Sequence, residues 1–152
     1  MPIEAPLSKH RRNSFLVYIA ICVGLALYFV YDGYYNKKFI EKHTVEGVPN
    51  ATLIVNRKAP SYLVGAAAIL GAYLFAIRKR RVVADENELV INDKQKISYD
   101  SIRRIDKTHF KSKGFFVITY EKENSGPVDF KISDKMYDNL APVLDKLVAK
   151  IS

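Results

Sequence analysis

The chain has 152 residues, a formal net charge of +8 and a hydrophobic fraction of 49%. A chain of this length accommodates one modest soluble core, which excludes a multidomain enzyme. The charge divides as +2 over residues 1–31, +2 over residues 32–60 and +4 over residues 61–152. No segment therefore gathers the cations of a nucleic-acid-binding domain, and we expect no nucleic-acid partner.

Residues 15–31 are uncharged, and extension to residue 35 gives the roughly 20 residues that a membrane-spanning helix requires. We predict a first transmembrane helix over residues 15–35, preceded by a cytoplasmic segment over residues 1–14. A cleaved signal peptide is the alternative interpretation. Large tyrosines and two lysines, Lys37 and Lys38, stand where the small residues of a cleavage site would follow.

A second uncharged stretch covers residues 60–77 and predicts a second transmembrane helix, with Pro60 in its first turn. A buried helix of a soluble core is the alternative, although 18 residues without one charge is long for such a helix. Residues 36–59 between the two spans are predicted to form an extracytoplasmic loop. Within that loop, the sequence ATLIVN at residues 51–56 has the β-branched content of a short strand.

Small residues recur at a spacing of four in both spans: Ala20 and Gly24 in the first, Ala67 and Gly71 in the second. Such faces let helices approach closely in lipid, so we predict that the spans pack as an antiparallel pair through them. The same faces are equally suited to the helices of a partner.

Four consecutive cations, Arg78, Lys79, Arg80 and Arg81, directly follow the second span. A basic run in this position is typical of a cytoplasmic anchor, because cations resist translocation and attract anionic headgroups. The two outer flanks carry seven cations and the joining loop carries five. This difference predicts a multi-pass protein of the cell inner membrane with both termini in the cytoplasm, and membrane lipids among its partners.

Residues 78–152 are predicted to form a cytoplasmic domain of antiparallel strands and one helix. Apolar residues alternate with polar ones in the segments ELVIN, KQKISY, SIRRIDK, GFFVITYE and PVDFKI. The strands follow one another too closely for helical crossovers, so hairpins must join them. Apolar residues at helical spacing predict an amphipathic helix near the C-terminus, with Ser133 or Asp134 as its cap and Pro142 as a kink or second start.

The segment RRVVADENELVINDKQKISYDSIRRIDK, the apolar positions Ile97, Tyr99 and Ile102, the strand FFVITYE and the final helix resemble the pleckstrin-homology-like domains of small bacterial two-span membrane proteins. The resemblance covers roughly half of the chain. It implies a fold class of a membrane α-helical hairpin plus an α+β domain, in which an antiparallel sheet or partial barrel is closed by a C-terminal helix. The stretch from Arg81 is short for a full domain of this type.

No arrangement of residues in the sequence meets the requirements of a catalyst, a metal site or a cofactor site, so we expect a non-enzymatic protein. The domain is predicted to bind a protein partner or to support a membrane complex. The alternatives are an accessory subunit that works through its transmembrane helices and a sensor of anionic lipids. The oligomeric state is open. Six basic residues are predicted to contact a ligand or partner: Lys94, Lys96, Arg103, Arg104, Lys111 and Lys113.

Overall fold

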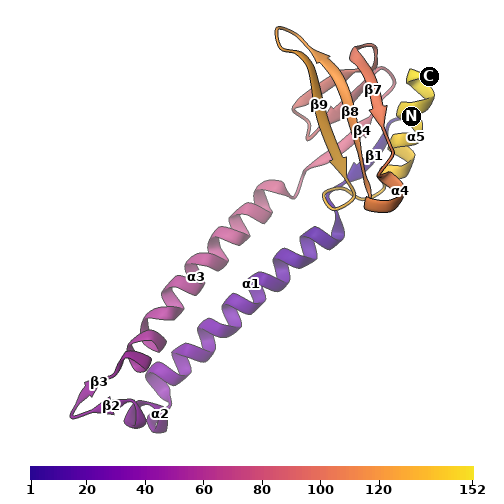
Figure 1. Cartoon of the computed structure of the whole chain (residues 1–152). Helices are drawn as coiled ribbons and strands as arrows, with labels where there is room; N and C mark the ends of the chain where they lie inside the picture. Colours follow the sequence, from indigo (N-terminus) through magenta and orange to yellow (C-terminus); the bar gives the residue numbers. More distant parts are fainter. The chain divides into compact units, whose positions relative to one another are not determined.

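A computed structural model describes residues 1–152, which form two compact units (Figure 1). The first unit combines residues 1–12 with residues 77–152, and the second contains residues 13–76. We call the first unit the sheet domain and the second the hairpin. The sheet domain is therefore discontinuous in sequence, since the hairpin is inserted within it.

The hairpin is built around two long helices that lie side by side and run antiparallel in Figure 1. Ring centroids of Phe15 and Tyr73 lie 5.3 Å apart near one end of the pair, and the Arg57 Nε donates to the Gly33 carbonyl over 2.9 Å near the other. The elements in chain order are α1 (Lys9–Val30), the π-helical turn η1 (Tyr31–Tyr35), α2 (Lys37–Lys42), β2 (Thr44–Val45), β3 (Val48–Pro49) and α3 (Ala51–Ile77).

Helix α3 begins nine residues before the predicted start of the second span, and the predicted strand at residues 51–56 is wrong. The side-chain oxygen of Asn50 accepts a hydrogen bond from the Leu53 N–H over 3.1 Å, which satisfies one of the unpaired donors at the helix start. This cap outweighs the β-branched composition of the first turns. Pro60 consequently lies inside the helix and not in its first turn.

The end of the hairpin near Arg57 is held by polar contacts that the sequence did not predict. Asp32 lies in the π-helical turn, is only 5% exposed and accepts from the Asn36 side-chain amide over 2.9 Å. The Arg57 guanidinium stands 5.6 Å from the centre of the Tyr34 ring. The predicted loop over residues 36–59 is therefore largely structured, because polar groups beside the turn find partners on α3.

The small residues of the two spans are only partly at the contact between the helices. Ala67 is 9% exposed. Ala20 and Gly24 are exposed, and a Cβ at Gly24 or Gly71 would meet nothing within 4 Å. The predicted packing face is thus not filled within this chain at Ala20 and Gly24. The buried small residues of the hairpin are instead Ala26, Gly33 and Ala67, and a Cβ at Gly33 would lie 3.2 Å from the Asn56 backbone.

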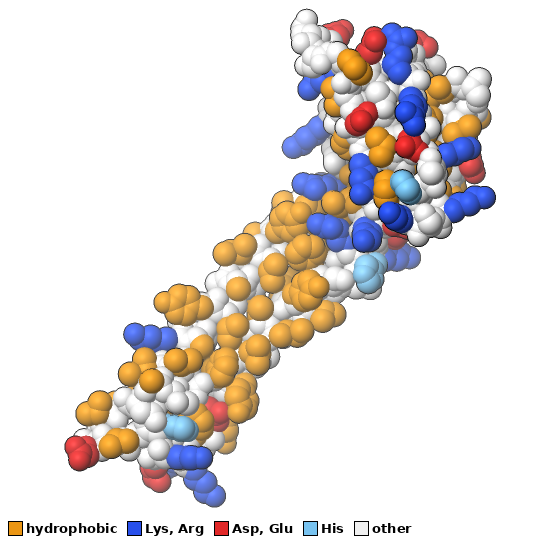
Figure 2. All heavy atoms as spheres, viewed as in Figure 1, with side chains coloured by type: hydrophobic (Ala, Val, Ile, Leu, Met, Phe, Trp, Pro, Cys, Tyr) orange, Lys and Arg blue, Asp and Glu red, His pale blue; other side chains and the backbone are white.

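Two helical stretches, Lys9–Tyr35 and Ala51–Ile77, are long and apolar enough to cross a membrane. Only 6% and 11% of their most apolar parts are buried, whereas the core helix of a soluble protein is mostly buried. Figure 2 shows that apolar side chains cover the surface of both helices. By length and composition, both helices suit a hydrocarbon environment.

The sheet domain contains seven strands in two antiparallel sheets. One sheet has the order β1-β4-β5-β6 and the other has the order β7-β8-β9. Their bounds are Ile3–Pro6 for β1, Arg81–Ala84 for β4, Glu88–Ile91 for β5, Gln95–Ser98 for β6, Ile102–Asp106 for β7, Phe115–Lys122 for β8 and Gly126–Ser133 for β9. The antiparallel sheet predicted from the alternating pattern is confirmed. A 3-10 turn, η2 (Tyr99–Ser101), joins β6 to β7.

The N-terminal strand β1 is the main departure from the sequence-based expectation. Residues 1–14 were expected to be a separate cytoplasmic segment, but β1 pairs with β4 and places Ala5 opposite Val82. Both side chains are fully buried. The domain therefore needs residues on both sides of the hairpin, and the predicted domain boundary at residue 78 leaves out one strand.

The core of the sheet domain lies between the two sheets and α5 (Leu140–Ile151). Period-two positions such as Leu89, Ile91, Phe116 and Ile118 are buried, as the alternation predicted. The C-terminal helix is confirmed, but it starts at Leu140 after Asn139 in a left-handed conformation (φ 62°), and not at residues 133–134. Pro142 is thus in the first turn, where its missing N–H has no helical partner to lose.

Candidate functional site

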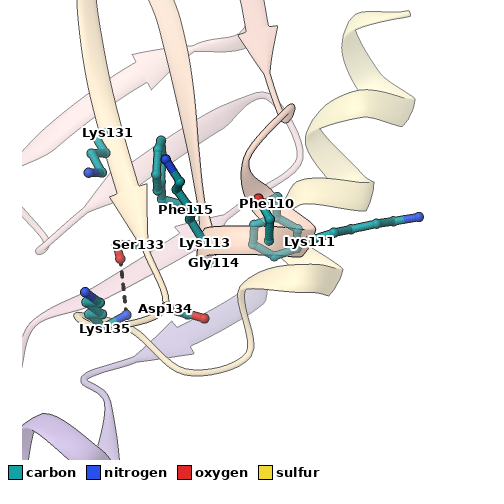
Figure 3. Close-up of a pocket in the computed structure, with 10 residues that line it drawn as sticks. Phe110, Lys111, Lys113, Gly114, Phe115, Lys131, Ser133, Asp134 and Lys135 are labelled. Atoms are coloured by element: carbon teal, nitrogen blue, oxygen red, sulfur yellow. Dashed lines mark hydrogen bonds between the residues drawn. The ribbon is translucent and has the colours of Figure 1, made fainter.

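A pocket of about 840 Å³ lies at one end of the β8/β9 hairpin in the sheet domain (Figure 3). Its walls come from α4 (Phe110–Lys113), the first residue of β8 and the last residues of β9 with the turn that follows. The lining residues are Phe110, Lys111, Ser112, Lys113, Gly114, Phe115, Lys131, Ser133, Asp134 and Lys135. Four of these ten residues are lysines, so we call this site the lysine pocket.

Backbone contacts fix the two walls of the lysine pocket against each other. Gly114 has φ 71° and ends α4 in the left-handed conformation that glycine adopts most readily. Its carbonyl accepts from the Asp134 N–H over 2.8 Å. The conformation therefore favours glycine here, and a Cβ at this position would also require the exposed Asp134 carboxylate to move.

Three lysines of the pocket, Lys113, Lys131 and Lys135, extend on the same side of the two strand ends in Figure 3, whereas Lys111 points away from them. All four side chains are exposed, and none of their ammonium groups forms an ion pair. The Lys131 Nζ lies 3.9 Å from the centre of the Phe115 ring, which favours a cation over its face. The pocket therefore carries positive charge that the protein itself does not neutralise by direct pairing.

Several other predicted contact residues are paired with acids. These pairs join Lys96 to Glu88 (3.2 Å), Arg103 to Glu121 (2.7 Å), Arg104 to Asp106 (3.8 Å), and Arg81 to both Asp93 (3.1 Å) and Glu4 (3.3 Å). The hydrogen bond and charge of Arg103 lower the pKa of the Glu121 carboxyl below its usual range. A neighbouring acid offsets each of these cations, so they offer less attraction to an outside anion than the lysine pocket does.

We call the four cations from Arg78 to Arg81 the basic junction, because they connect the end of α3 to the start of β4. Arg78, Lys79, Arg80 and Arg81 line a second cavity of about 470 Å³ together with Glu4, Pro6, Leu7 and Asp93. Two carboxylates among the lining residues reduce its net charge. Lys94 lies in the turn between β5 and β6 and is exposed. The structure thus places Lys111 and Lys113 at the lysine pocket, and it places Arg103 and Arg104 together at a smaller cavity of about 210 Å³ beside the end of α5.

The wall of the lysine pocket that contains Lys135 continues directly into the contacts that hold the start of α1. The Ser8 N–H donates to the Met136 carbonyl over 2.9 Å. Two residues further, the Asp138 N–H donates to the Pro6 carbonyl, and the Asp138 carboxylate accepts from the Lys9 N–H, each over 2.9 Å. The pocket and the strand-to-helix connection therefore belong to the same edge of the domain.

The three histidines lie in different surroundings. His43 contacts the Asn50 side-chain amide over 3.1 Å, His109 packs 5.4 Å from the Phe115 ring centroid, and His10 is on the first turn of α1. No group of three or more His, Cys, Asp or Glu side chains in residues 1–152 is placed to hold a metal ion. Lysine, phenylalanine and serine are the residue types that the pocket presents, and they suit binding of an anion.

Sequence reasoning missed Lys131 and Lys135. A signal for them existed in the β8/β9 hairpin: counting outward from the turn pairs Lys122 with Gly126 and, at the far end, Phe115 with Ser133. That register, continued by two residues, places Lys135 opposite Lys113, and it pairs Lys131 with Val117 near the start of β8. Comparison with protein-family models, with curated proteins and with solved structures finds no match to the chain.

Proposed function

We propose that the chain is a non-enzymatic two-pass membrane protein whose sheet domain acts as an interaction module at one membrane face. The observation that carries this proposal is the contrast in burial between the units. Apolar side chains cover the outside of α1 and α3, and the same residue types are inside the sheet domain. An exposed apolar surface of this length is costly in water and stable in hydrocarbon.

The pairing of β1 with β4 supports a topology in which both termini are on the same side of the membrane. The two strands lie on opposite sides of the hairpin in sequence and belong to one sheet. A chain that crosses the bilayer twice returns to its starting side, as this pairing requires. The basic junction and the cations at residues 9–12 support the cytoplasm as that side by the positive-inside rule.

The arrangement of the sheet domain also supports the pleckstrin-homology-like assignment that the sequence suggests. Sheets of four and three antiparallel strands and a C-terminal helix agree with the expected sheet or partial barrel. The stretch from Arg81 alone is short for a full domain of this type, but β1 supplies a further strand from the part of the sequence before the hairpin. We therefore propose a domain of this type with a membrane hairpin inserted after its first strand.

The chain has two surfaces suited to partners, one in the sheet domain and one in the hairpin. The outer edge of β9 has no neighbouring strand in its sheet, and an extended peptide can pair with such an edge. In the hairpin, the exposed face that contains Ala20 and Gly24 is open to another helix. The second observation favours the alternative function, that of an accessory subunit of a larger membrane complex.

Topology is tested with single cysteines in a Cys22→Ala background. Pro2→Cys and Ser125→Cys are expected to react with a membrane-impermeant maleimide only after intact cells are permeabilised, whereas Glu46→Cys in the β2/β3 turn is expected to react without permeabilisation. Reaction of position 2 and position 125 from opposite sides would contradict the proposal.

The two candidate functions are separated by exchange of the spans. A chimera in which residues 15–35 and 60–77 are replaced by polyleucine keeps β1, the basic junction and the sheet domain. If the domain is the interaction module, proteins that co-purify with the full chain from native membranes are retained by the chimera. Their loss from the chimera would favour the accessory-subunit alternative.

A further inference from the structure

We infer that the lysine pocket binds the phosphomonoester headgroup of an anionic lipid in the membrane that holds the hairpin. This inference rests on the proposed function, because it requires the hairpin to be embedded in that membrane. The lysine pocket is distinct from the turn between β5 and β6 with Lys94 and Lys96, and from the basic junction. The group that the pocket would recognise is a terminal phosphate, which phosphatidic acid and lipids with a phosphorylated sugar headgroup both carry.

The chemistry of the pocket matches a terminal phosphate better than a diester. A phosphomonoester carries about −1.5 to −2 charges near neutral pH and three strong acceptor oxygens. Lys113, Lys131 and Lys135 present three ammonium groups from three segments, and lysine binds phosphate as a point charge. A phosphodiester such as that of phosphatidylglycerol offers less charge and fewer free oxygens. The pocket is therefore expected to select monoesters over diesters.

The local charge balance leaves these lysines available. Asp134 is the only acid among the lining residues, and its carboxylate lies against Gly114. Lys131 is positioned over the Phe115 ring, where a cation keeps its charge and all its N–H donors. The volume of about 840 Å³ exceeds what a bare phosphate fills, which leaves room for the group that carries the phosphate.

The location of the pocket within the sheet domain suits a lipid. Lys135 is next to Met136, whose carbonyl holds Ser8 at the start of α1. Residues 9–14 form the polar first part of α1 before its apolar stretch, and six residues of helix extend about 9 Å. A headgroup layer is about 5–8 Å thick on each side of the hydrocarbon. The chain that leaves this edge of the domain thus reaches the apolar stretch of α1 within about the thickness of a headgroup layer, which favours a membrane lipid over a soluble phosphate ester.

The test uses the full-length chain in mild detergent with equal amounts of phosphatidylcholine, phosphatidylglycerol and phosphatidic acid, and native mass spectrometry counts the lipids that remain bound. The variant is Lys113→Gln, Lys131→Gln and Lys135→Gln together. The matched control is Lys94→Gln, Lys107→Gln and Lys122→Gln, which removes the same charge from exposed lysines that do not line the pocket. A third variant changes the three pocket lysines to arginine.

We expect the wild-type chain and the matched control to retain phosphatidic acid over phosphatidylglycerol by a similar ratio. The pocket variant should lose that preference by about tenfold or more, since each cation near an anionic surface contributes about fivefold. The arginine variant should keep binding, and the thermal unfolding midpoints of all variants should agree. An equal loss in the pocket variant and the matched control would overturn the inference.

A second arm adds sn-glycerol 3-phosphate at millimolar concentration. Retention of the lipid in its presence supports a membrane ligand, whereas complete displacement would reassign the pocket to a soluble phosphate ester and overturn the lipid assignment. The lipid-binding and cysteine-topology experiments together also distinguish failure of this inference from failure of the proposed function. Correct cysteine topology with unchanged lipid selectivity in the pocket variant would refute only the lysine pocket, while reaction of positions 2 and 125 from opposite sides would refute the membrane proposal itself.

Discussion

The hairpin and the sheet domain use similar apolar residues in opposite ways. In the hairpin, Leu27 is 68% exposed and Ile69 is 72% exposed. In the sheet domain, Leu89, Phe116 and Ile118 are fully buried. Figure 2 shows the consequence, with apolar side chains over the helices and basic side chains scattered over the domain. The two units are therefore suited to different solvents, although both use the same apolar residue types.

Burial together with local composition therefore distinguishes the two units, whereas the composition of the whole chain does not. A mean hydropathy of −0.07 for the whole chain is that of an ordinary soluble protein and hides the division. The sheet domain gains stability by removing apolar surface from water. The hairpin keeps its backbone hydrogen bonds inside its helices, as hydrocarbon requires. The predictions below exploit this division.

The largest expected effect comes from the core of the sheet domain. Phe116→Ala removes a fully buried ring and should lower the free energy of unfolding of the domain by about 3–5 kcal/mol. Leu27→Ala on the exposed face of α1 should change it by less than about 0.5 kcal/mol. Urea unfolding of the full chain in detergent, followed by circular dichroism, measures both. Equal losses for the two variants would contradict the contrast between a buried apolar core in the sheet domain and an exposed apolar surface on the hairpin.

A backbone position beside the lysine pocket gives the next largest effect. Gly114→Ala must hold φ near 71° and displace the Asp134 carboxylate, so we expect a loss of about 1–3 kcal/mol, mainly from the left-handed backbone. Removal of the carboxylate in a Gly114→Ala, Asp134→Ala double variant should recover the part of the loss that is due to the collision. The same urea titration measures both variants, and an unchanged midpoint for Gly114→Ala alone would contradict the geometry.

A buried tyrosine predicts a loss of stability at alkaline pH. Burial, reinforced by the charges of Asp85, Glu86 and Glu88, raises the pKa of Tyr99 from 10 to about 12, and its hydroxyl donates to the Asp85 carbonyl over 2.7 Å. The folded state binds this proton more tightly than the unfolded state does. The corresponding stability is present below pH 10 and is lost as the pH rises through 12.

The size of this alkaline effect is at most about 2.7 kcal/mol, because the pKa rises by about two units and one unit corresponds to about 1.4 kcal/mol. Tyr99→Phe lacks the titrating group, so the difference in stability between wild type and Tyr99→Phe should shrink between pH 10 and pH 12. Stability curves of both proteins over this interval provide the measurement. A difference that is constant with pH would show that the hydroxyl is not buried in the folded domain.

The smallest effect is expected at the surface. Arg103→Ala breaks an exposed ion pair with Glu121 and should cost less than about 1 kcal/mol, an amount that 0.5 M salt should largely remove. A larger, salt-insensitive loss of stability would indicate that Arg103 has a structural contact beyond this pair. Comparison of the variant at low and high salt makes the distinction.

Local patterns in the sequence were sufficient for much of the architecture. The uncharged runs at residues 15–31 and 60–77 predict long apolar helices, because a single charge is costly in hydrocarbon. The strands from Glu88 onward follow from alternation and nearby turns. These features depend on neighbours within a few residues, which the sequence displays directly.

The features that sequence reasoning missed depend on contacts between distant segments. Strand β1 has four residues, too few for a visible alternation, and its partner follows more than 70 residues later. The first turns of α3 contain Arg57 and Lys58, so hydropathy alone placed the start of the helix too late. The lysine pocket combines α4 with the far end of β9, and only the register of the hairpin brings them together.

The central claim is that β1 and β4 pair across the inserted hairpin, and a disulfide tests it most directly. In a Cys22→Ala background, Glu4→Cys and Val83→Cys stand at paired positions, whereas Glu4→Cys and Val90→Cys are separated by the intervening strand β4. Directly paired residues have Cβ atoms about 4.5–5.5 Å apart, close enough for oxidation to link them. After mild oxidation of the full-length protein, the first pair should migrate faster on a non-reducing gel and the second should not. Absence of the cross-link in the first pair, or equal cross-linking in both, would contradict the account.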